Sequence, residues 1–485
     1  MVLSACALGG CALGPRYEAP TASALGVPQA YGVAGADAAP IDLAIWWRRF
    51  DDPELSGLIE TATVANLDIA VSRARLVQAR EQLIQTRASL LPTVNGSAGA
   101  GRTAVWSPRT TASIGGVTVG SGGASGATQL SVGLDASWQV DLFGGLRRSV
   151  EAARASRDAA LFDLAAVRTS VAGEVATNYI DARLAQARLA IARDTLRTQD
   201  DNLQIAQWRV RAGLAPATDA EQARAQRAQT EASIPLLETS YAGAVHRLGV
   251  LTGQAPGALR LSLDKGGPIP RGPDGVAVGI PADTLRQRPD VRAAERNLAA
   301  ATARIGVAEA QLYPALTLPG SLTATAASLG GPATVTGQVF ADMSKTIFAA
   351  GRLRSQVRSA RAAADSAFAT YKQTVLTGLE DVENAIQASN SAKARQGSLA
   401  VAFDASGNAA TLARALYRVG RTDFLTLLQS EQSLLSSRDS LASAQADQAL
   451  AQVRLYLALG GGWQAASPAT VEPIPMKPTP MKPTP

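Results

Sequence analysis

The sequence has little cysteine and almost no histidine. Cys6 and Cys11 are the two cysteines, both in the first eleven positions, and His246 is the one histidine among 485 residues. This placement excludes a disulfide framework for the rest of the chain and leaves no set of cysteines and histidines to bind a metal. The sequence also lacks a glycine-rich phosphate loop and a recognisable catalytic triad. We therefore expect no cofactor, and an enzyme is the least favoured class of protein.

Aromatic residues and long apolar runs are also lacking. Aromatic residues make up 5% of the chain, and the absence of any run of about 18 apolar residues predicts no transmembrane helix. Much of the apolar content is alanine, and such small side chains favour closely packed helices over a rounded core. The net charge is +6, but the arginines are dispersed among acidic residues without interleaved aromatics. Nucleic acid is therefore not an expected partner.

The N-terminal segment MVLSACALGGCALGPRYEAP contains two candidate lipoprotein processing sites. Small residues precede both Cys6 and Cys11, as they do in bacterial lipoproteins whose cysteine is cleaved and acylated. A secretory signal also has a basic region and an apolar core, and both are missing from this segment. A plain tail of small residues is therefore the alternative interpretation.

The chain contains an internal repeat. Residues 73–98 (RARLVQAREQLIQTRASLLPTVNGSA) correspond to residues 295–320 (ERNLAAATARIGVAEAQLYPALTLPG). Further along, equivalent residues lie 207 positions apart, as Gly213 and Gly420 do. Self-similarity of this kind indicates duplicated structural units. Each half is predicted to contain a helix, two strands, a long helix, a turn and a second helix.

Each half has two segments in which apolar and polar residues alternate. The segments are residues 93–106 and 128–142 in the first half, and 315–326 and 333–347 in the second. A period of two is typical of strands with one apolar and one polar face. Strands of ten or more residues are long enough to cross a bilayer at a tilt. A soluble antiparallel hairpin would show the same alternation, and it is the alternative for each pair.

Long helices follow both pairs of strands. Residues 145–212 and 351–419 contain hardly any glycine or proline, so each predicts a helix roughly 100 Å long at 1.5 Å per residue. The helix predicted after residue 420 has leucines at intervals of seven, which is typical of coiled-coil packing. These leucines are Leu427, Leu434, Leu441 and Leu455, with Gln448 as the exception.

Gly213 and Gly420 occupy equivalent places after the long helices. Glycine is the residue that most readily adopts the left-handed conformation that ends a helix, and Pro216 then marks the restart after the first glycine. A connection this short makes neighbouring helices antiparallel. Each half therefore predicts a long helical hairpin.

Four strands per chain are too few to close a membrane barrel, because the smallest common barrels have about eight. Open strand edges are not tolerated in lipid. If these strands enter a membrane, several copies of the chain must share one barrel. Three copies would supply twelve strands and would arrange their long helices around the same axis. The parts together favour a passive conduit.

Three stretches of the sequence carry a resemblance to a known family. They are IWWRRFDDPELSGLIETATVANLDIAVSRARLVQAREQLIQTRASLLP at 45–92, RQRPDVRAAERNLAAATARIGVAEAQLYPALTL at 286–318 and CALGPRYEAP at 11–20. They resemble TolC-like outer-membrane factors, and most closely the RND efflux lipoprotein branch typified by NodT and OprM. The resemblance extends in order to about Trp463. It implies a mainly α fold with β, internally duplicated, in which a homotrimer shares a 12-stranded β-barrel in outer-membrane lipid and long antiparallel helices form a periplasmic α-barrel.

The resemblance also implies a function. Such a trimer is an outer-membrane exit duct that docks onto a periplasmic adaptor protein and an inner-membrane RND pump, and exports drugs or other small toxic compounds. The family carries its lipid on the cysteine before GP.Y..P, which selects Cys11 over Cys6. The pump chooses the compound, because a wide passive tube has little selectivity of its own.

Two other functions are compatible with parts of the sequence. The exit duct of a type I protein secretion system has the same fold, but the lipoprotein-like N-terminus argues against it. A soluble coiled-coil scaffold would account for the heptads. It would not account for four alternating strands at matching places in a repeat.

These interpretations divide the chain into consecutive segments. They are a lipoprotein-like segment and linker (1–44), the helices of repeat 1 (45–92), β-hairpin 1 (93–142), long helix pair 1 (143–255), an inter-repeat linker (256–287), the helix of repeat 2 (288–314), β-hairpin 2 (315–347), long helix pair 2 (348–460) and a proline-rich disordered tail (461–485).

Family members narrow at the periplasmic tips of the helical hairpins, often with acidic residues just after the tip glycine. Asp219, six residues after Gly213, fits that pattern. In the second hairpin the two corresponding positions hold Thr426 and Gln429, so Asp423 is the alternative acidic residue there. A first-turn acid favoured by the helix dipole is the alternative interpretation of Asp219.

Carboxylates from three chains at one axis would repel one another or bind cations, and links to Arg211 or Arg418 would hold the tips closed. The resemblance also implies that the adaptor docks against the hairpin ends, at Gly213 and Gly420. Their role as helix caps is compatible with docking.

Overall fold

The computed structural model describes residues 12–32, 43–106, 110–114, 117–121, 124–273, 281–328 and 331–463. The candidate lipidation sites Cys6 and Cys11 and the tail from residue 464 onward lie outside these ranges. The chain divides into two compact units. The first comprises Met1–Ala19, Arg75–Ala160 and Ala294–Tyr371, and the second comprises Pro20–Ala74, Leu161–Ala293 and Lys372–Pro485.

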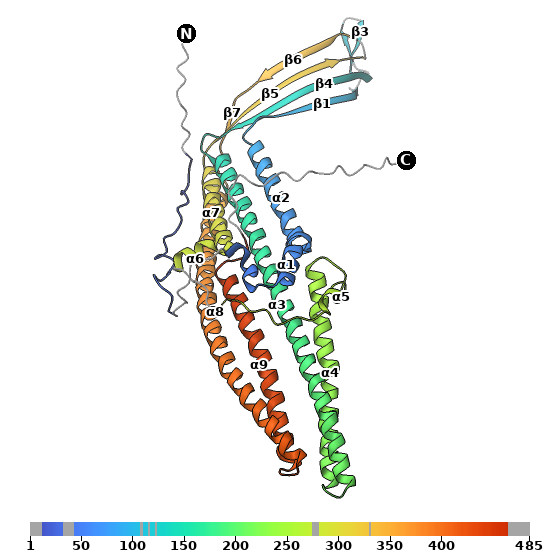
Figure 1. The fold of residues 1–485 in the computed structure, drawn as a ribbon. Helices are drawn as coiled ribbons and strands as arrows, with labels where there is room; N and C mark the ends of the chain where they lie inside the picture. The colour runs from blue at the N-terminus through green and yellow to red at the C-terminus, as the bar shows by residue number, and fades with distance from the viewer. Residues whose placement is uncertain are drawn as a thin grey trace. The chain divides into compact units, whose positions relative to one another are not determined.

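The described elements alternate between helices and strands in the order of the predicted repeat (Figure 1). In chain order they are η1 (Leu43–Phe50), α1 (Pro53–Ala65), α2 (Leu67–Ala88), β1 (Thr93–Trp106), β2 (Thr110–Ile114), β3 (Val117–Ser121), β4 (Ala124–Val140), α3 (Gly145–Arg211), α4 (Ala217–Leu251), α5 (Arg260–Leu263), α6 (Pro281–Gln287), α7 (Pro289–Ala310), β5 (Ala315–Ala326), β6 (Ala333–Val339), β7 (Asp342–Ser344), α8 (Arg352–Arg418) and α9 (Phe424–Ala458).

The two long helices, α3 and α8, have 67 residues each, and the helices that return beside them, α4 and α9, have 35 each. The bounds of α3 and α8 lie within one residue of those predicted from the sequence. Matched lengths in the two halves show that the duplication is structural as well as sequential. Each long helix and its partner form a hairpin (Figure 1).

The two halves also repeat a contact at the far end of each hairpin. The Asn66 side-chain amide donates to the Leu251 carbonyl oxygen at 2.9 Å, and the Arg288 guanidinium donates to the Ala458 carbonyl oxygen at 3.2 Å. Leu251 and Ala458 are 207 positions apart, which is the spacing of the repeat. The final carbonyls of a helix have no hydrogen-bond partner within that helix. Each half therefore satisfies one such carbonyl with a side chain that lies just before another helix, Asn66 before α2 and Arg288 before α7.

The antiparallel sheet of the first unit has the strand order β1-β4-β5-β6, with β7 also pairing with β5 (Figure 1). Adjacent strands from the two halves meet in the middle, where Leu134 of β4 lies opposite Leu322 of β5. β2 and β3 form a separate two-stranded ribbon. The sequence predicted only a connection in that glycine- and serine-rich stretch, and placed the start of β4 at residue 128 rather than at Ala124.

The prediction of one continuous strand over residues 333–347 is wrong. β6 ends at Val339, and β7 covers only Asp342–Ser344. Proline has no N–H to donate to a neighbouring strand. Pro319 of β5 accepts from the Phe340 N–H at 2.9 Å but cannot return a hydrogen bond. The ladder between β5 and its outer neighbour is therefore interrupted at this point.

Aromatic side chains form the core around η1 in the second unit. Trp46 is fully buried and stacks on Tyr456 of α9, with ring centroids 5.5 Å apart. Phe50 packs edge-on against Trp46 at 5.9 Å. The heptad surface of α9 is buried along its length, at Leu427 near the hairpin tip and at Leu455 beside Tyr456. Burial of this kind supplies most of the stabilisation of a long amphipathic helix.

Within the described ranges, no helix combines the length and the apolar character that crossing a bilayer requires.

Candidate functional site

Both long helices end in the same backbone motif at the hairpin tips. Gly213 has a φ of 69° and Gly420 a φ of 73°, a left-handed conformation that glycine adopts without the steric penalty of a Cβ. The Gly213 N–H donates to the Val210 carbonyl at 3.0 Å and the next N–H donates to the Arg209 carbonyl at 2.8 Å. Gly420 is the centre of the equivalent pair, at 3.0 and 2.9 Å. These two hydrogen bonds define a Schellman cap.

The helices that follow the tips begin differently in the two halves. At α9, Asp423 is the N-cap, and its Oδ1 accepts from the Thr426 N–H at 2.8 Å. Hydrogen bonds from Thr426 hold the pKa of the exposed Asp423 carboxyl below its usual range. At α4, Pro216 holds the N-cap position without a side-chain hydrogen bond. One oxygen of Asp423 therefore caps a helix, a role that the sequence did not assign to it.

A contact between the two hairpins lies one turn below these tips. The Arg209 guanidinium of α3 donates to the Tyr417 carbonyl of α8 at 2.9 Å and lies over the Tyr417 ring, 4.6 Å from the ring centroid. Tyr417 is 2% exposed. This cation–π pair could not be predicted from the sequence, because it joins residues from different halves of the repeat. The Arg209–Tyr417 pair ties the first hairpin to the second.

Asp219 acts electrostatically on the same tyrosine. Burial raises the pKa of the Tyr417 hydroxyl, the Arg209 cation lowers it, and the Asp219 carboxylate raises it. Asp219 is in the first turn of α4, where its N–H donates to the Pro216 carbonyl at 3.1 Å. Both interpretations of Asp219 are therefore compatible with its position, because it is a first-turn acid that also acts on a residue of the opposite hairpin.

The other candidate gate residues lie on exposed positions near the tips. Arg211 donates to the Gln207 carbonyl in its own helix at 3.3 Å, and Arg418 and Gln429 are exposed. Within the described part of a single chain, the ion pairs include none from Arg211 or Arg418. Within the described residues of one chain, Asp219 therefore forms no ion pair with Arg211 or Arg418.

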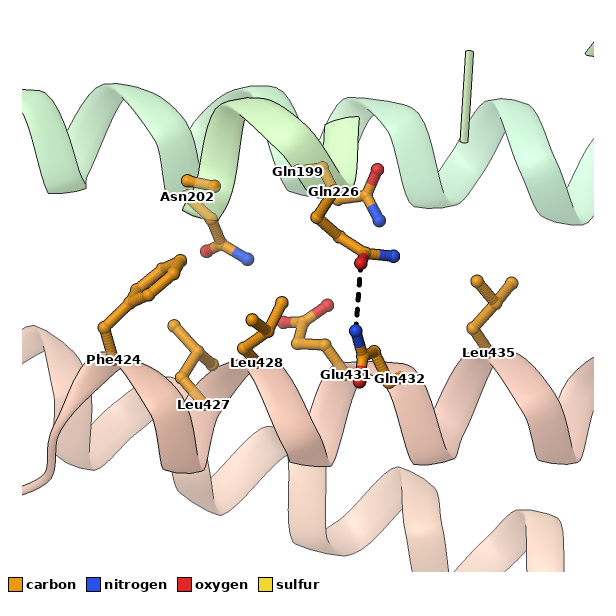
Figure 2. Close-up of a pocket in the computed structure, with 10 residues that line it drawn as sticks. Gln199, Asn202, Gln226, Phe424, Leu427, Leu428, Glu431, Gln432 and Leu435 are labelled. Carbon is orange, nitrogen blue, oxygen red and sulfur yellow. Dashed lines mark hydrogen bonds between the residues drawn. The ribbon is translucent and has the colours of Figure 1, made fainter. Parts of the chain in front are cut away.

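Beneath the tips, the two hairpins enclose a pocket with mixed walls (Figure 2). Phe424 and Leu427 of α9 supply apolar walls, and the Gln432 amide of α9 donates to Gln226 of α4 at 2.9 Å. Glu431 of α9 is largely buried and pairs with Arg414 of α8 at 2.5 Å. The seam between the hairpins is therefore joined by a few polar contacts around an apolar cluster. That cluster contains Ala206, Ala223, Ala413, Tyr417, Phe424 and Leu427.

The sheet of the first unit has two chemically different faces. The residues that share a face with Leu134 form an apolar surface. The residues that share the opposite face with Asp135 form a surface of hydroxyls and amides. Large side chains on the apolar face are well exposed, with Val132 at 64%, Leu134 at 53% and Leu322 at 51%. Exposed apolar area of this extent marks a surface that contacts lipid or protein.

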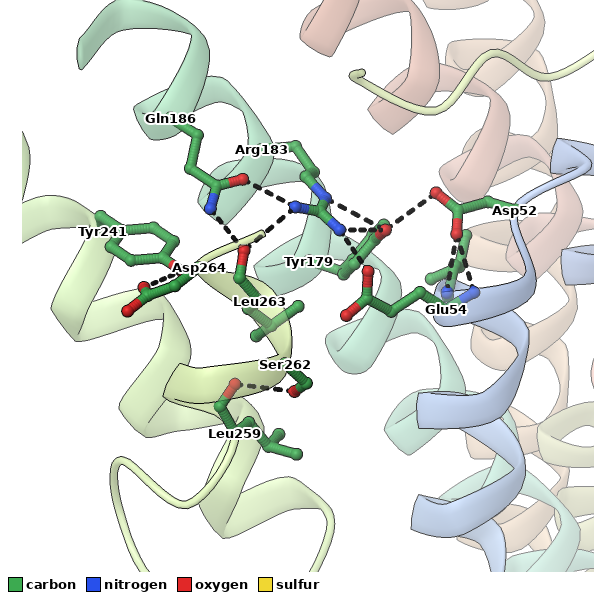
Figure 3. A network of polar contacts seen from close by, with 11 residues as sticks. Asp52, Glu54, Tyr179, Arg183, Gln186, Tyr241, Leu259, Ser262, Leu263 and Asp264 are labelled. Atoms are coloured by element: carbon green, nitrogen blue, oxygen red, sulfur yellow. Dashed lines mark hydrogen bonds and ion pairs between the residues drawn. The ribbon is translucent and has the colours of Figure 1, made fainter. Parts of the chain in front are cut away.

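The second unit also contains a buried polar network, away from the hairpin tips in the sequence (Figure 3). Arg183 of α3 is 3% exposed, pairs with Glu54 of α1 and donates to the Tyr179 hydroxyl at 3.1 Å. That hydroxyl donates to Asp52, the N-cap of α1, at 2.9 Å. Arg183 also reaches the Leu263 carbonyl at 3.4 Å. The network joins α1, α3 and the segment between the halves, and we interpret it as structural.

No group of three or more potential metal-ligating side chains occurs in the described ranges. Two features of the architecture indicate a function instead. They are long helical hairpins with matched tips, and a sheet with one apolar and one polar face. These features define an internally duplicated channel-type protein with a helical part and a β part.

The model of the family described as "Outer membrane efflux protein" matches residues 58–254 and 280–461. The chain belongs to this family, which consists of outer-membrane channel proteins rather than enzymes.

Individual relatives match over almost their whole length. Nodulation protein T of Rhizobium leguminosarum bv. viciae is 33% identical over 471 residues, covering 96% of this chain and 93% of that protein. The pyoverdine export outer membrane protein OpmQ of Pseudomonas putida is 31% identical over 435 residues, covering 87% and 89%. The solved structure of the outer-membrane channel OprN has a TM-score of 0.84 and 35% identity, covering 93% of this chain and 100% of that one.

Arg209→Ala is expected to loosen the contact between the two hairpin tips. Losing both the hydrogen bond and the cation–π contact at a buried tyrosine removes about 1 to 2 kcal/mol of local stabilisation. Chymotrypsin should then cut more quickly around Tyr417 and Phe424, as followed by mass spectrometry of the released peptides. Arg211→Ala, which alters an exposed neighbour, serves as the control. Equal cleavage rates in the two variants would contradict the assigned role of Arg209.

Arg183→Ala is expected to destabilise the second unit strongly. Removing one member of a buried ion pair leaves its partners without compensation and costs about 3 kcal/mol. Thermal unfolding of the purified protein should show a melting temperature several degrees lower. The matched control is Arg224→Ala, because the Arg224–Glu221 pair is 73% and 72% exposed and such pairs contribute less than about 1 kcal/mol. A similar melting temperature for both variants would show that the network is dispensable.

Proposed function

We propose that the protein is the trimeric outer-membrane exit duct of a tripartite efflux system. In this function it passively conducts drugs or other small toxic compounds that an inner-membrane RND pump and a periplasmic adaptor protein deliver. Family membership supports the efflux role, and the relative named for pyoverdine export supports a small-molecule cargo. The lipoprotein-like N-terminus favours this function over type I protein secretion.

The two-faced sheet is the observation that carries the proposal. Its apolar face suits lipid and its polar face suits a water-filled interior, as in membrane barrels whose residues alternate outward and inward. Among the described strands of this sheet, β1 and β6 are at the outer edges and each pairs on one side only. Lipid does not satisfy free backbone groups. The edges of one copy therefore require those of another, and three copies give a closed ring of twelve strands.

The helical hairpins would extend this ring as an α-barrel in the periplasm. The matched caps at Gly213 and Gly420 present similar tips in both halves, which suits docking of the adaptor on alternating hairpins. In a trimer, Asp219 and Asp423 would be candidates for an acidic constriction, with Thr426 and Gln429 beside them. Arg211 and Arg418 are available to pair with acidic residues of a neighbouring copy.

The N-terminal segment supports attachment to the same membrane. Cys11 is the residue proposed to carry the lipid, with Cys6 as the less favoured site. The Leu13 N–H donates to the Phe143 carbonyl at 3.2 Å, beside the point at which β4 gives way to α3. An acyl group on Cys11, two residues before Leu13, would thus be close to the end of a strand that the proposal puts in the membrane.

Leu134→Arg tests whether the apolar face meets lipid. An arginine on the lipid face near the middle of the bilayer costs about 3 kcal/mol, and every copy of the chain in the trimer carries this cost. The full-length chain with its native signal should then disappear from the outer-membrane fraction, whereas Ser137→Arg, on the polar face, should remain there. Recovery of the unaltered chain as a soluble monomer would favour the scaffold and reject the duct.

Asp219→Ala tests the proposed constriction. With three carboxylates removed from the axis, the conductance of the channel in planar bilayers should increase and its block by divalent cations should weaken. Thr218→Ala is a neighbouring control that leaves the charge unchanged. Identical conductance and cation dependence in the Asp219→Ala channel would remove this residue from the constriction and leave the helix-dipole interpretation.

A further inference from the structure

The two β-hairpins of the chain have the same strand register. In the first hairpin Ala98 lies opposite Val132, and in the second Gly320 lies opposite Val339. These are equivalent pairs, since the first strands of the hairpins are offset by 222 positions and the second strands by 207. The agreement continues past the interruption at Pro319, where β7 resumes pairing with β5.

This register places two carboxylates at one equivalent position. Asp135 of β4 lies opposite Asn95 of β1, and Asp342 of β7 lies opposite Thr317 of β5. Asn95 and Thr317 are 222 positions apart, and Asp135 and Asp342 are 207 apart. The duplicated sheet thus has an acidic residue at the same register level in both of its halves.

Both carboxylates are on the polar face. Asp135 lies opposite Ser321 on β5, and Ser321 and Thr317 share one face because they are four residues apart on a strand. Both Asp135 and Asp342 are exposed. Around Asp135 the face is hollowed into a shallow pocket lined by Asn95, Ser137, Pro319, Ser321 and Phe340.

Among the described side chains of this sheet, no cation lies on the same face as these two carboxylates. In the strands of this sheet whose side chains are described, Arg102 is the basic residue, and it lies opposite Thr128 in the series of Leu130 and Leu134. Arg102 therefore belongs to the apolar face. Lys345 follows the end of β7 and continues the series of Met343, which faces the same way as Leu316.

We propose that Asp135 and Asp342 set a preference for cations in the β part of the conduit. This inference rests on the proposed trimeric duct, in which a threefold axis combined with the internal repeat gives approximate sixfold symmetry. Equivalent residues of the two halves then lie at one level, so six carboxylates form a single ring. Rings of acidic side chains concentrate cations and exclude anions in channels. Cargo bearing a protonated amine would pass this level more readily than an anionic compound of the same size.

The purified full-length protein tests this in planar bilayers, with the reversal potential measured across a tenfold gradient of potassium chloride. Unaltered channels should favour potassium over chloride. Asp135→Asn and Asp342→Asn should each lower the permeability ratio, because each removes three of the six carboxylates, and the double variant should lower it by at least about twofold. The double change to lysine should favour chloride.

Two controls separate the charge effect from a folding defect. Arg102→Gln changes a charge of the same sheet on the opposite face and should leave the ratio unaltered. The double change of both aspartates to glutamate keeps the charges and should keep the ratio. An unchanged ratio in channels with both aspartates replaced by asparagine would overturn the inference while leaving the duct intact. Failure of the unaltered protein to form channels would instead reject the duct.

Discussion

Helix ends closed by a left-handed glycine are the constraint on which the architecture depends. The helices α3, α4, α8 and α9 are followed by Gly213, Gly253, Gly420 and Gly460, whose φ values lie between 69° and 79°. In each case the glycine N–H and the next N–H return to the last turn of the helix. This geometry reverses the chain without exposing the final carbonyls. At Gly253 and Gly460 it also lets another part of the backbone approach to within about 3 Å of where a side chain would begin.

Most of the helical architecture could be predicted from the sequence, because its signals are local. Absence of breakers predicted α3 and α8 to within one residue, and glycines predicted the tips. The second hairpin was harder. The alternation of residues 333–347 resumes after a single exception at Phe340, yet the strand itself is interrupted because of Pro319, a residue on a neighbouring strand. Effects of one strand on another are invisible to a pattern read along a single segment.

The residues around the tips also include some whose place could be predicted from the sequence and others whose place could not. Gly213 and Gly420 have an intrinsic conformational preference, so their structural place could be predicted. The importance of Arg209 could not, because its partner Tyr417 is 208 residues away and the two lie in unlike positions of the repeat. The sequence makes Asp423 a candidate axial acid, but it does not reveal that the Asp423 side chain caps α9. Resemblance to a family indicates which positions of the chain are candidates for a role, whereas the hydrogen bonds of a side chain depend on its own neighbours.

The equal register of the two β-hairpins restricts where their lengths can vary. Between equivalent pairing positions, the first hairpin runs from Asn95 to Asp135 and the second from Thr317 to Asp342, so the first has fifteen additional residues. All fifteen lie between Ala104 and Gly126, the pair equivalent to Ala326 and Ala333, and the register of the strands is unchanged. Since a slip of one residue would exchange the two faces, length variation is confined to the end of the sheet at which β1 and β4 connect. That end can therefore change in length and sequence while the two faces of the sheet stay as they are.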